Sequence, residues 1–100
     1  MTTQTAHPGT IKMIDVYDRS TREVPFESVP PRQQFVMLDK DGIETHDAGL
    51  AVERIPIVQV RVLRLDATGA LAPAHRTVEM RILEYGPDER LLRSTTMTKD

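Results

Sequence analysis

The sequence has 100 residues, of which 39% are hydrophobic and 28% are charged, and its formal net charge at pH 7 is −2. This size and composition suit one globular domain and exclude a disordered chain, and the slightly negative charge offers no long-range attraction for nucleic acid or an anionic membrane. Cysteine is absent, which excludes disulfides, thiolate catalysis and zinc–thiolate sites.

The two ends of the chain are polar. Residues 1–10 lack the apolar stretch of a signal peptide, and residues 98–100 have no apolar face to anchor them, so we expect both segments to be disordered tails. No run reaches the roughly 18 apolar residues of a membrane-spanning helix. We therefore expect a soluble, cytoplasmic protein with no membrane partner, in which residues 11–97 form a single β-rich domain.

The first predicted strand covers residues 11–17, where apolar side chains predominate. Three prolines follow at Pro25, Pro30 and Pro31. Proline has no N–H to donate to a strand ladder, so it is confined to edge strands or to extended segments outside a sheet. We therefore predict that residues 24–31 are extended or lie at a sheet edge.

Two short apolar runs, residues 34–38 and 43–45, flank the sequence Asp39-Lys40-Asp41-Gly42. An Asp-Gly step between apolar runs is a strong hairpin signal, because glycine adopts the positive φ that tight turns require. A calcium loop would need a third acid and a later glutamate that are missing here. We therefore predict a β-hairpin and no metal site.

The best helix candidate is the segment 47–55. Asp47 is a good N-cap, and Pro56 would end the helix. Gly49 weakens such a helix by up to about 1 kcal/mol relative to alanine, so an irregular loop remains the alternative. At most one short helix is expected in the chain.

One eight-residue pattern occurs twice, at residues 58–65 and 78–85. Each copy reads apolar, polar, apolar, Arg, β-branched, Leu, charged, apolar, and each leads into a turn sequence rich in Gly, Asp or Pro. Alternation with a period of two residues is typical of a half-buried strand. Residues 90–97 are the last predicted strand. If the last strand pairs with residues 78–85 through a tight turn over 86–89, Ile82 would lie opposite Arg93. Alternation alone therefore does not determine the register between these two strands.

Both repeated strands carry apolar side chains on two faces. The first face is predicted to be core: Val60, Val62, Met80 and Ile82. The second face needs a cover from a helix, the first strand or another subunit, unless a bulge in each strand resets the alternation. Its apolar residues are Leu63, Leu65, Leu83 and Tyr85. We predict a mainly β domain, with β-rich α+β as the alternative, built from antiparallel sheets of about five or six strands.

The residues that might carry chemistry are few. His46 beside Asp47 resembles a general-base pair, but no nucleophile motif such as Gly-x-Ser-x-Gly accompanies it, and a solvated histidine is the simpler interpretation. Arg61 and Arg81 on neighbouring strands could bind an anion, but acidic and amide residues between them favour cross-strand pairing. We predict no catalytic residue, no cofactor and no metal ligand.

The sequence therefore favours a non-catalytic binding or assembly module that acts through protein–protein contact, with a protein partner or a second copy of the chain. The alternative is a small enzyme or ligand-binding protein that uses His46, Asp47 and the arginine stripe. A nucleic-acid-binding protein ranks third, and nucleic acid is not expected as a partner. The predicted interaction surface comprises six residues: Leu63, Leu65, Leu83, Tyr85, Arg61 and Arg81.

Overall fold

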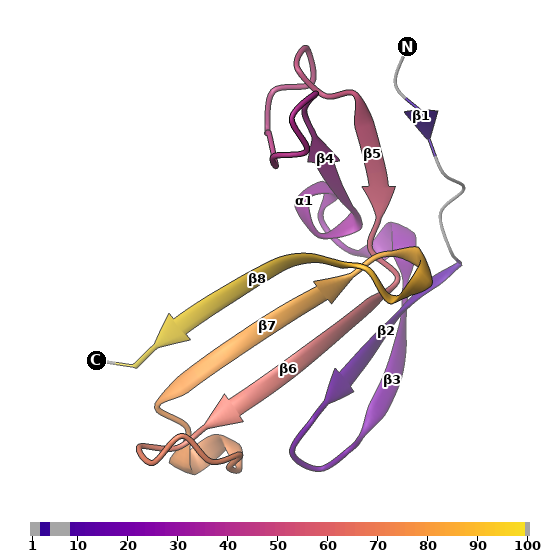
Figure 1. Ribbon diagram of the computed structural model, residues 1–100. Coiled ribbons are helices and arrows are strands. Elements are labelled where there is room, and N and C mark those ends of the chain that lie inside the picture. Colours follow the sequence, from indigo (N-terminus) through magenta and orange to yellow (C-terminus); the bar gives the residue numbers. More distant parts are fainter. Residues whose placement is uncertain (1–2, 5–8, 100) are drawn as a thin grey trace.

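The computed structural model describes residues 3–4 and 9–99, with side chains from residue 9 onward, and confirms a small, mainly β domain (Figure 1). The large sheet has the strand order β3-β2-β6-β7-β8. Its strands are β2 (Thr10–Asp15), β3 (Thr21–Pro25), β6 (Gln59–Leu65), β7 (Glu79–Tyr85) and β8 (Leu91–Thr98). The small sheet has the order β1-β5-β4. Its strands are β1 (Thr3–Gln4), β4 (Phe35–Leu38) and β5 (Glu53–Pro56).

The helical segments are all short. One turn of α-helix, α1 (Pro31–Gln34), precedes β4, and the remaining segments are 3-10 turns. These turns are η1 (Phe26–Ser28), η2 (Ala74–Arg76) and η3 (Pro87–Glu89). Figure 1 shows α1 and the small sheet standing over one end of the large sheet, whose other end extends away from them.

The large sheet is mixed, whereas antiparallel sheets were expected from the sequence. β2 runs parallel to β6, with Met13 opposite Val60, whereas the other neighbours in this sheet are antiparallel. Parallel neighbours need a long connection. The chain supplies one in residues 16–58, which contain β3, α1, β4 and β5, so two strands of the small sheet are part of the crossover. β3 lies at the edge of the sheet and ends at Pro25, as the proline spacing predicts, but residues 26–28 form the 3-10 turn η1 and Pro31 begins α1, so the rest of the segment 24–31 is not uniformly extended.

The predicted helix over residues 47–55 is wrong. Asp47 instead begins a turn, its carbonyl accepting a backbone N–H three residues later at 3.0 Å, and the segment continues as β5. Ile55 of β5 lies opposite Val36 of β4, and both side chains are buried. The observed helix begins at Pro31, a residue that suits the first helical position. Burial against β4 outweighs the weak helix propensity of this segment.

The folded chain extends slightly beyond residues 11–97. Thr10 begins β2, Thr98 ends β8, and Thr3–Gln4 pair with β5, so these residues belong to strands rather than to tails. The expectation of disordered tails also covers residues outside the described part of the chain: 1–2, 5–8 and 100.

The register between β7 and β8 is shifted by two residues from the one that a tight turn over residues 86–89 would give. Arg93 lies opposite Glu84 rather than Ile82, and the pairing shifts at the step from Glu84 to Tyr85. Two features lengthen the connection: the 3-10 turn η3 and this irregularity in the ladder. The observed register places opposite charges side by side, where the predicted one placed a charge beside an apolar residue.

The core lies at the junction of the two sheets. The rings of Phe26 and Phe35 meet edge to face there, with their centroids 5.2 Å apart. The buried cluster consists of Ile11, Phe26, Phe35, Val36, Leu38, Ile55, Ile57 and Val60. Of the four predicted core residues on the first face, only Val60 is buried; Val62 and Ile82 are half-buried against the cluster, and Met80 is half-buried outside it. The prediction was too broad because the small sheet covers only one end of the large one.

Two Asp-x-x-Gly turns have the same hydrogen bonds. The carbonyls of Asp39 and Asp66 each accept the N–H of the glycine three residues later, at 3.0 Å. Gly42 and Gly69 have positive φ values of 77° and 87°, a region that glycine enters without steric cost. Each aspartate carboxylate also accepts the N–H groups two and four residues later. The predicted turn over residues 39–42 is confirmed, but its second arm, residues 43–45, forms only an isolated bridge between Glu44 and Leu38, and the strand partner of β4 is β5.

We expect Asp66 to titrate below the ordinary aspartate value. The Thr68 hydroxyl donates to its carboxylate at 2.6 Å, and this hydrogen bond, together with backbone donors, lowers the pKa of Asp66 below 3.8. Because the folded pKa is lowered, the associated stabilisation is present at neutral pH and is lost as the pH falls through the folded value. NMR titration should show the low pKa, and Thr68→Ala should raise it. An Asp66 pKa unchanged by this substitution would contradict the assignment.

Candidate functional site

The side chains of His46 and Asp47 form no hydrogen bond with each other within residues 9–99. His46 is exposed, and its side chain makes no hydrogen bond within residues 9–99. The Asp47 carboxylate accepts the N–H of Gly49 at 2.9 Å, so it is engaged in its own turn. A general base needs a group that orients it, and Asp47 does not orient His46 here. Across residues 3–4 and 9–99, no cluster of three His, Asp or Glu residues is placed to hold a metal ion.

The six residues of the predicted interaction surface lie on one face of the large sheet, which we call the second face. Arg61 of β6 lies opposite Leu83 of β7, and Leu63 lies opposite Arg81. The Arg61 guanidinium also stacks over the Tyr85 ring, 4.8 Å from its centroid. The pairing of β6 with β7 is regular throughout, so the alternative of a bulge in each repeated strand is wrong.

The second face is less apolar than the leucine spacing alone suggests. Leu63 and Leu83 each have an arginine as cross-strand neighbour, and the long apolar stems of arginine can cover such surfaces. Arg81 also pairs with Glu79 at 2.8 Å. Leu65 is buried, because residues 66–78 fold back so that Leu71 forms a bridge with it. Leu63 and Leu83 remain half-buried, and whether a partner covers them stays a prediction.

The first face of the large sheet is open beyond the core. The side chains of Met13, Val62 and Ile82 continue the apolar surface from Val60 outward. They form the floor of a groove with a volume of about 580 Å³. The η1–α1 segment forms one wall through Val29 and its neighbours. Met97 of β8 lines the groove and is 44% exposed.

The placement of the small sheet explains why this apolar surface stays open. Val62 and Ile82 extend the apolar first face beyond the buried core, and the small sheet stands over only one end of the large sheet. An ion pair between Asp15 and Arg64 follows on the same face, further from the core. The groove therefore lies between the buried core and a polar pair. Of the residues assigned to the alternative ligand site, His46 lines the groove, but Arg61 and Arg81 lie on the opposite face.

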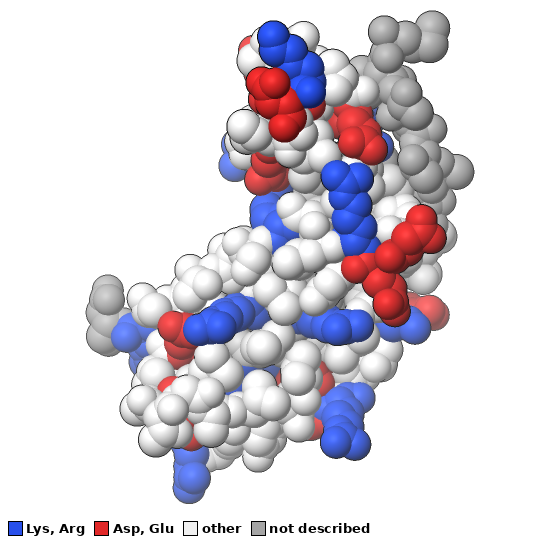
Figure 2. All heavy atoms as spheres, in the orientation of Figure 1, with Lys and Arg blue, Asp and Glu red and all other residues white. Residues whose placement is uncertain are grey.

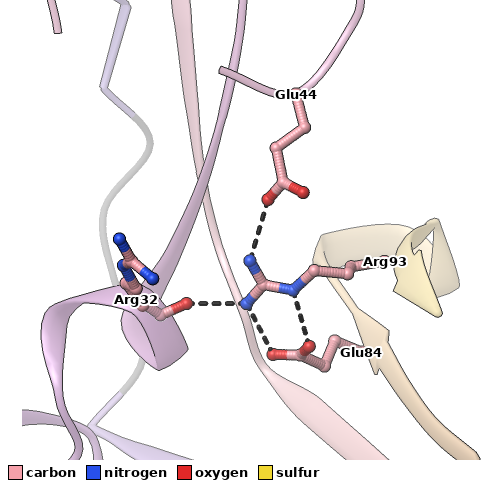
Figure 3. A network of polar contacts seen from close by, with 4 residues as sticks. All are labelled: Arg32, Glu44, Glu84 and Arg93. Carbon is pink, nitrogen blue, oxygen red and sulfur yellow. Dashed lines mark hydrogen bonds and ion pairs between the residues drawn. The ribbon is translucent and has the colours of Figure 1, made fainter. Parts of the chain in front are cut away.

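Arg93 is the centre of a polar network beside the groove (Figure 3). Its guanidinium donates from Nε to Glu84 Oε1 at 2.7 Å and from Nη2 to Glu84 Oε2 at 2.9 Å. Nη1 donates to Glu44 Oε2 at 2.8 Å, and Nη2 also donates to the Arg32 carbonyl oxygen at 2.6 Å. One side chain of β8 thus connects β7, the hairpin after β4, and α1.

The network compensates a buried charge. Glu84 is only 7% exposed, and a buried carboxylate is costly unless it is paired and hydrogen-bonded. The hydrogen bond with Glu84 raises the pKa of Arg93 above its ordinary value. Sequence reasoning missed this pair because it depends on the register between β7 and β8. The available signal was the cost of placing Arg93 beside Ile82, a mismatch that a shift of two residues removes.

The charges at the groove rim are unbalanced. Both acidic residues that line the groove, Glu44 and Glu84, bind Arg93. Arg22 and Arg32 also line it, and their side chains form no ion pair within the described part of the chain. On the face in view in Figure 2, charges of both signs are intermixed: a row of charged side chains crosses the large sheet, and further charged side chains lie around its margins. The rim therefore has spare positive charge beside an apolar floor.

No helix in the described segments is long and apolar enough to cross a membrane. The chain matches no protein family, no curated protein and no solved structure.

Proposed function

We propose that this protein is a non-catalytic binding module that acts through protein–protein contact, and that the groove on the first face receives its partner. The observation that carries the proposal is the apolar floor that continues past the core into an open groove of about 580 Å³. Apolar surface left open on a small domain commonly marks a partner site. Met13, Val62 and Ile82 would contact apolar side chains of the partner.

The rim suggests the charge of that partner. Arg22 and Arg32 are exposed and unpaired within the described residues, whereas the acidic residues of the groove are neutralised by Arg93. A segment with apolar side chains flanked by Asp or Glu fits this arrangement, because complementary charge at a rim favours correct encounter. The scatter of His46, Asp47, Arg61 and Arg81 over separate surfaces supports a binding module over an enzyme.

Site-specific photocrosslinking in the cells that produce the protein tests this proposal. A photoreactive phenylalanine in place of Arg22 faces the groove, and the same residue in place of Glu23 faces the other side of the same edge strand. Both positions are exposed, so the comparison is matched. We expect a discrete crosslinked product from position 22 and none at the same mass from position 23.

A substitution in the groove floor tests whether the crosslinked partner binds through the groove. Ile82→Glu places a charge on the apolar floor and should abolish the product from position 22, whereas Arg81→Glu on the opposite face should leave it unchanged. Circular dichroism should be used to check that both variants are folded. Identical products from positions 22 and 23, or a product that survives Ile82→Glu in a folded protein, would overturn the proposal.

A further inference from the structure

The two edge strands of the large sheet differ in how well they are protected from pairing with other chains. β3 carries Arg22, Glu23 and Pro25, and charges and proline are the features that prevent edge strands from pairing with other chains. β8 is longer, and residues 94–98 read Ser-Thr-Thr-Met-Thr, without charge, glycine or proline. All five are exposed. β8 is thus an unprotected edge composed largely of threonine, which favours strands.

The hydrogen bonds of β8 show which backbone groups face outward. The N–H of Lys99 donates to the Val78 carbonyl at 2.8 Å, so this is a hydrogen-bonded pair. Such pairs alternate along an antiparallel ladder. Arg93, Thr95 and Met97 therefore bond to β7, whereas the N–H and C=O groups of three residues point away from the sheet: Ser94, Thr96 and Thr98.

We infer that two copies of this chain pair along β8, antiparallel, and join their large sheets into one continuous sheet. A second copy fits because the edge is self-complementary. With Ser94 of one copy opposite Thr96 of the other, the outward N–H and C=O groups bond to each other, and Thr95 lies opposite Thr95. Threonine and serine pairs across strands are favourable. Arg93 then lies opposite Met97, so no like charges meet.

The pairing would also join the two binding grooves. Thr95 and Met97 line the groove at its β8 side. Across the two-fold axis, they would meet the corresponding residues of the second copy on the same face of the sheet. This inference rests on the edge of β8 and does not depend on what the groove binds.

A proline substitution at an outward position tests the inference. Thr96→Pro removes an outward N–H while leaving the ladder with β7 intact, since proline is tolerated on an edge strand where its N–H would face solvent. Thr96→Ser keeps the N–H and is the control. Analytical ultracentrifugation should show a dimer for the wild type and for Thr96→Ser, and self-association at least about tenfold weaker for Thr96→Pro.

Leu83→Glu separates this pairing from association through the second face. If β8 is the interface, Leu83→Glu should remain dimeric. A dimer that Leu83→Glu dissociates and Thr96→Pro does not would overturn the inference, as would a wild type that stays monomeric at high concentration.

Hydrogen exchange on the wild type gives an answer even if Thr96→Pro does not fold. The amides of Ser94, Thr96 and Thr98 should exchange more slowly as the protein concentration rises, because they become bonded to the second copy. Amides at these positions that exchange at the same fast rate at all concentrations would also overturn the inference.

Discussion

Replacing Arg93 with methionine is expected to lower the free energy of unfolding by about 3 kcal/mol, because it leaves the buried Glu84 carboxylate without its partner. Methionine keeps much of the apolar stem, so the loss reports mainly on the charge and its hydrogen bonds. The same substitution also removes the donors to Glu44 and to the Arg32 carbonyl, which connect the small sheet and α1 to β8. Urea denaturation measures the change.

Two control variants make this result interpretable. Arg90→Ala removes an exposed ion pair in which Arg90 Nη1 and Glu53 Oε2 are 3.8 Å apart, and it should cost less than about 1 kcal/mol. The double variant Arg93→Met with Glu84→Leu should recover much of the loss, because an apolar pair replaces an unpaired buried charge. Equal losses for Arg93→Met and Arg90→Ala would show that the network contributes little to stability.

Ile57→Ala is expected to reduce the free energy of unfolding by about 3 kcal/mol. Ile57 is 0% exposed and lies between β5 and β6, where the chain passes from the small sheet to the large one. Its backbone N–H donates to the Gln34 carbonyl at 2.8 Å, so the backbone is held in place and cannot readily close the cavity that alanine would leave. Ile57→Val removes only one methyl group and should cost about 1 kcal/mol.

The matched control is Leu50→Ala, since Leu50 is 60% exposed on a turn. That substitution should change stability by no more than about 0.5 kcal/mol. Denaturation midpoints for the three variants should therefore fall in the order Ile57→Ala, Ile57→Val and Leu50→Ala, with the lowest first. A cost for Ile57→Ala as small as that for Leu50→Ala would place the core elsewhere than at the junction of the sheets.

Ile57 and Arg93 lie at the same junction between the two sheets. Ile57 fills the apolar part of it, and Arg93 connects its polar side beside the groove. Loss of either should loosen the small sheet against the large one and so disturb the groove wall formed by α1. The floor residues Val62 and Ile82 belong to the large sheet and should be less affected.

The local sequence determined most strands of the large sheet and the tight turns. Alternation over residues 58–65 and 78–85 predicts β6 and β7, since each side chain of a strand points to the face opposite its neighbours. The Asp-Gly step at residues 41–42 predicts the hairpin after β4, because a turn needs only a few local contacts. The same alternation also predicts that Arg61, Leu63, Arg81 and Leu83 share one face, and they do.

Only the tertiary structure decided which apolar surface is covered. The segment 47–55 has weak helix signals, and it becomes partly strand because Ile55 is buried against β4. The parallel pairing of β2 with β6, and the register that joins Glu84 to Arg93, depend on contacts between residues far apart in the chain. The extent of the core follows from where the crossover lies on the sheet. The open groove results from this placement, because a sequence pattern specifies which residues are apolar but not which of them another element will cover.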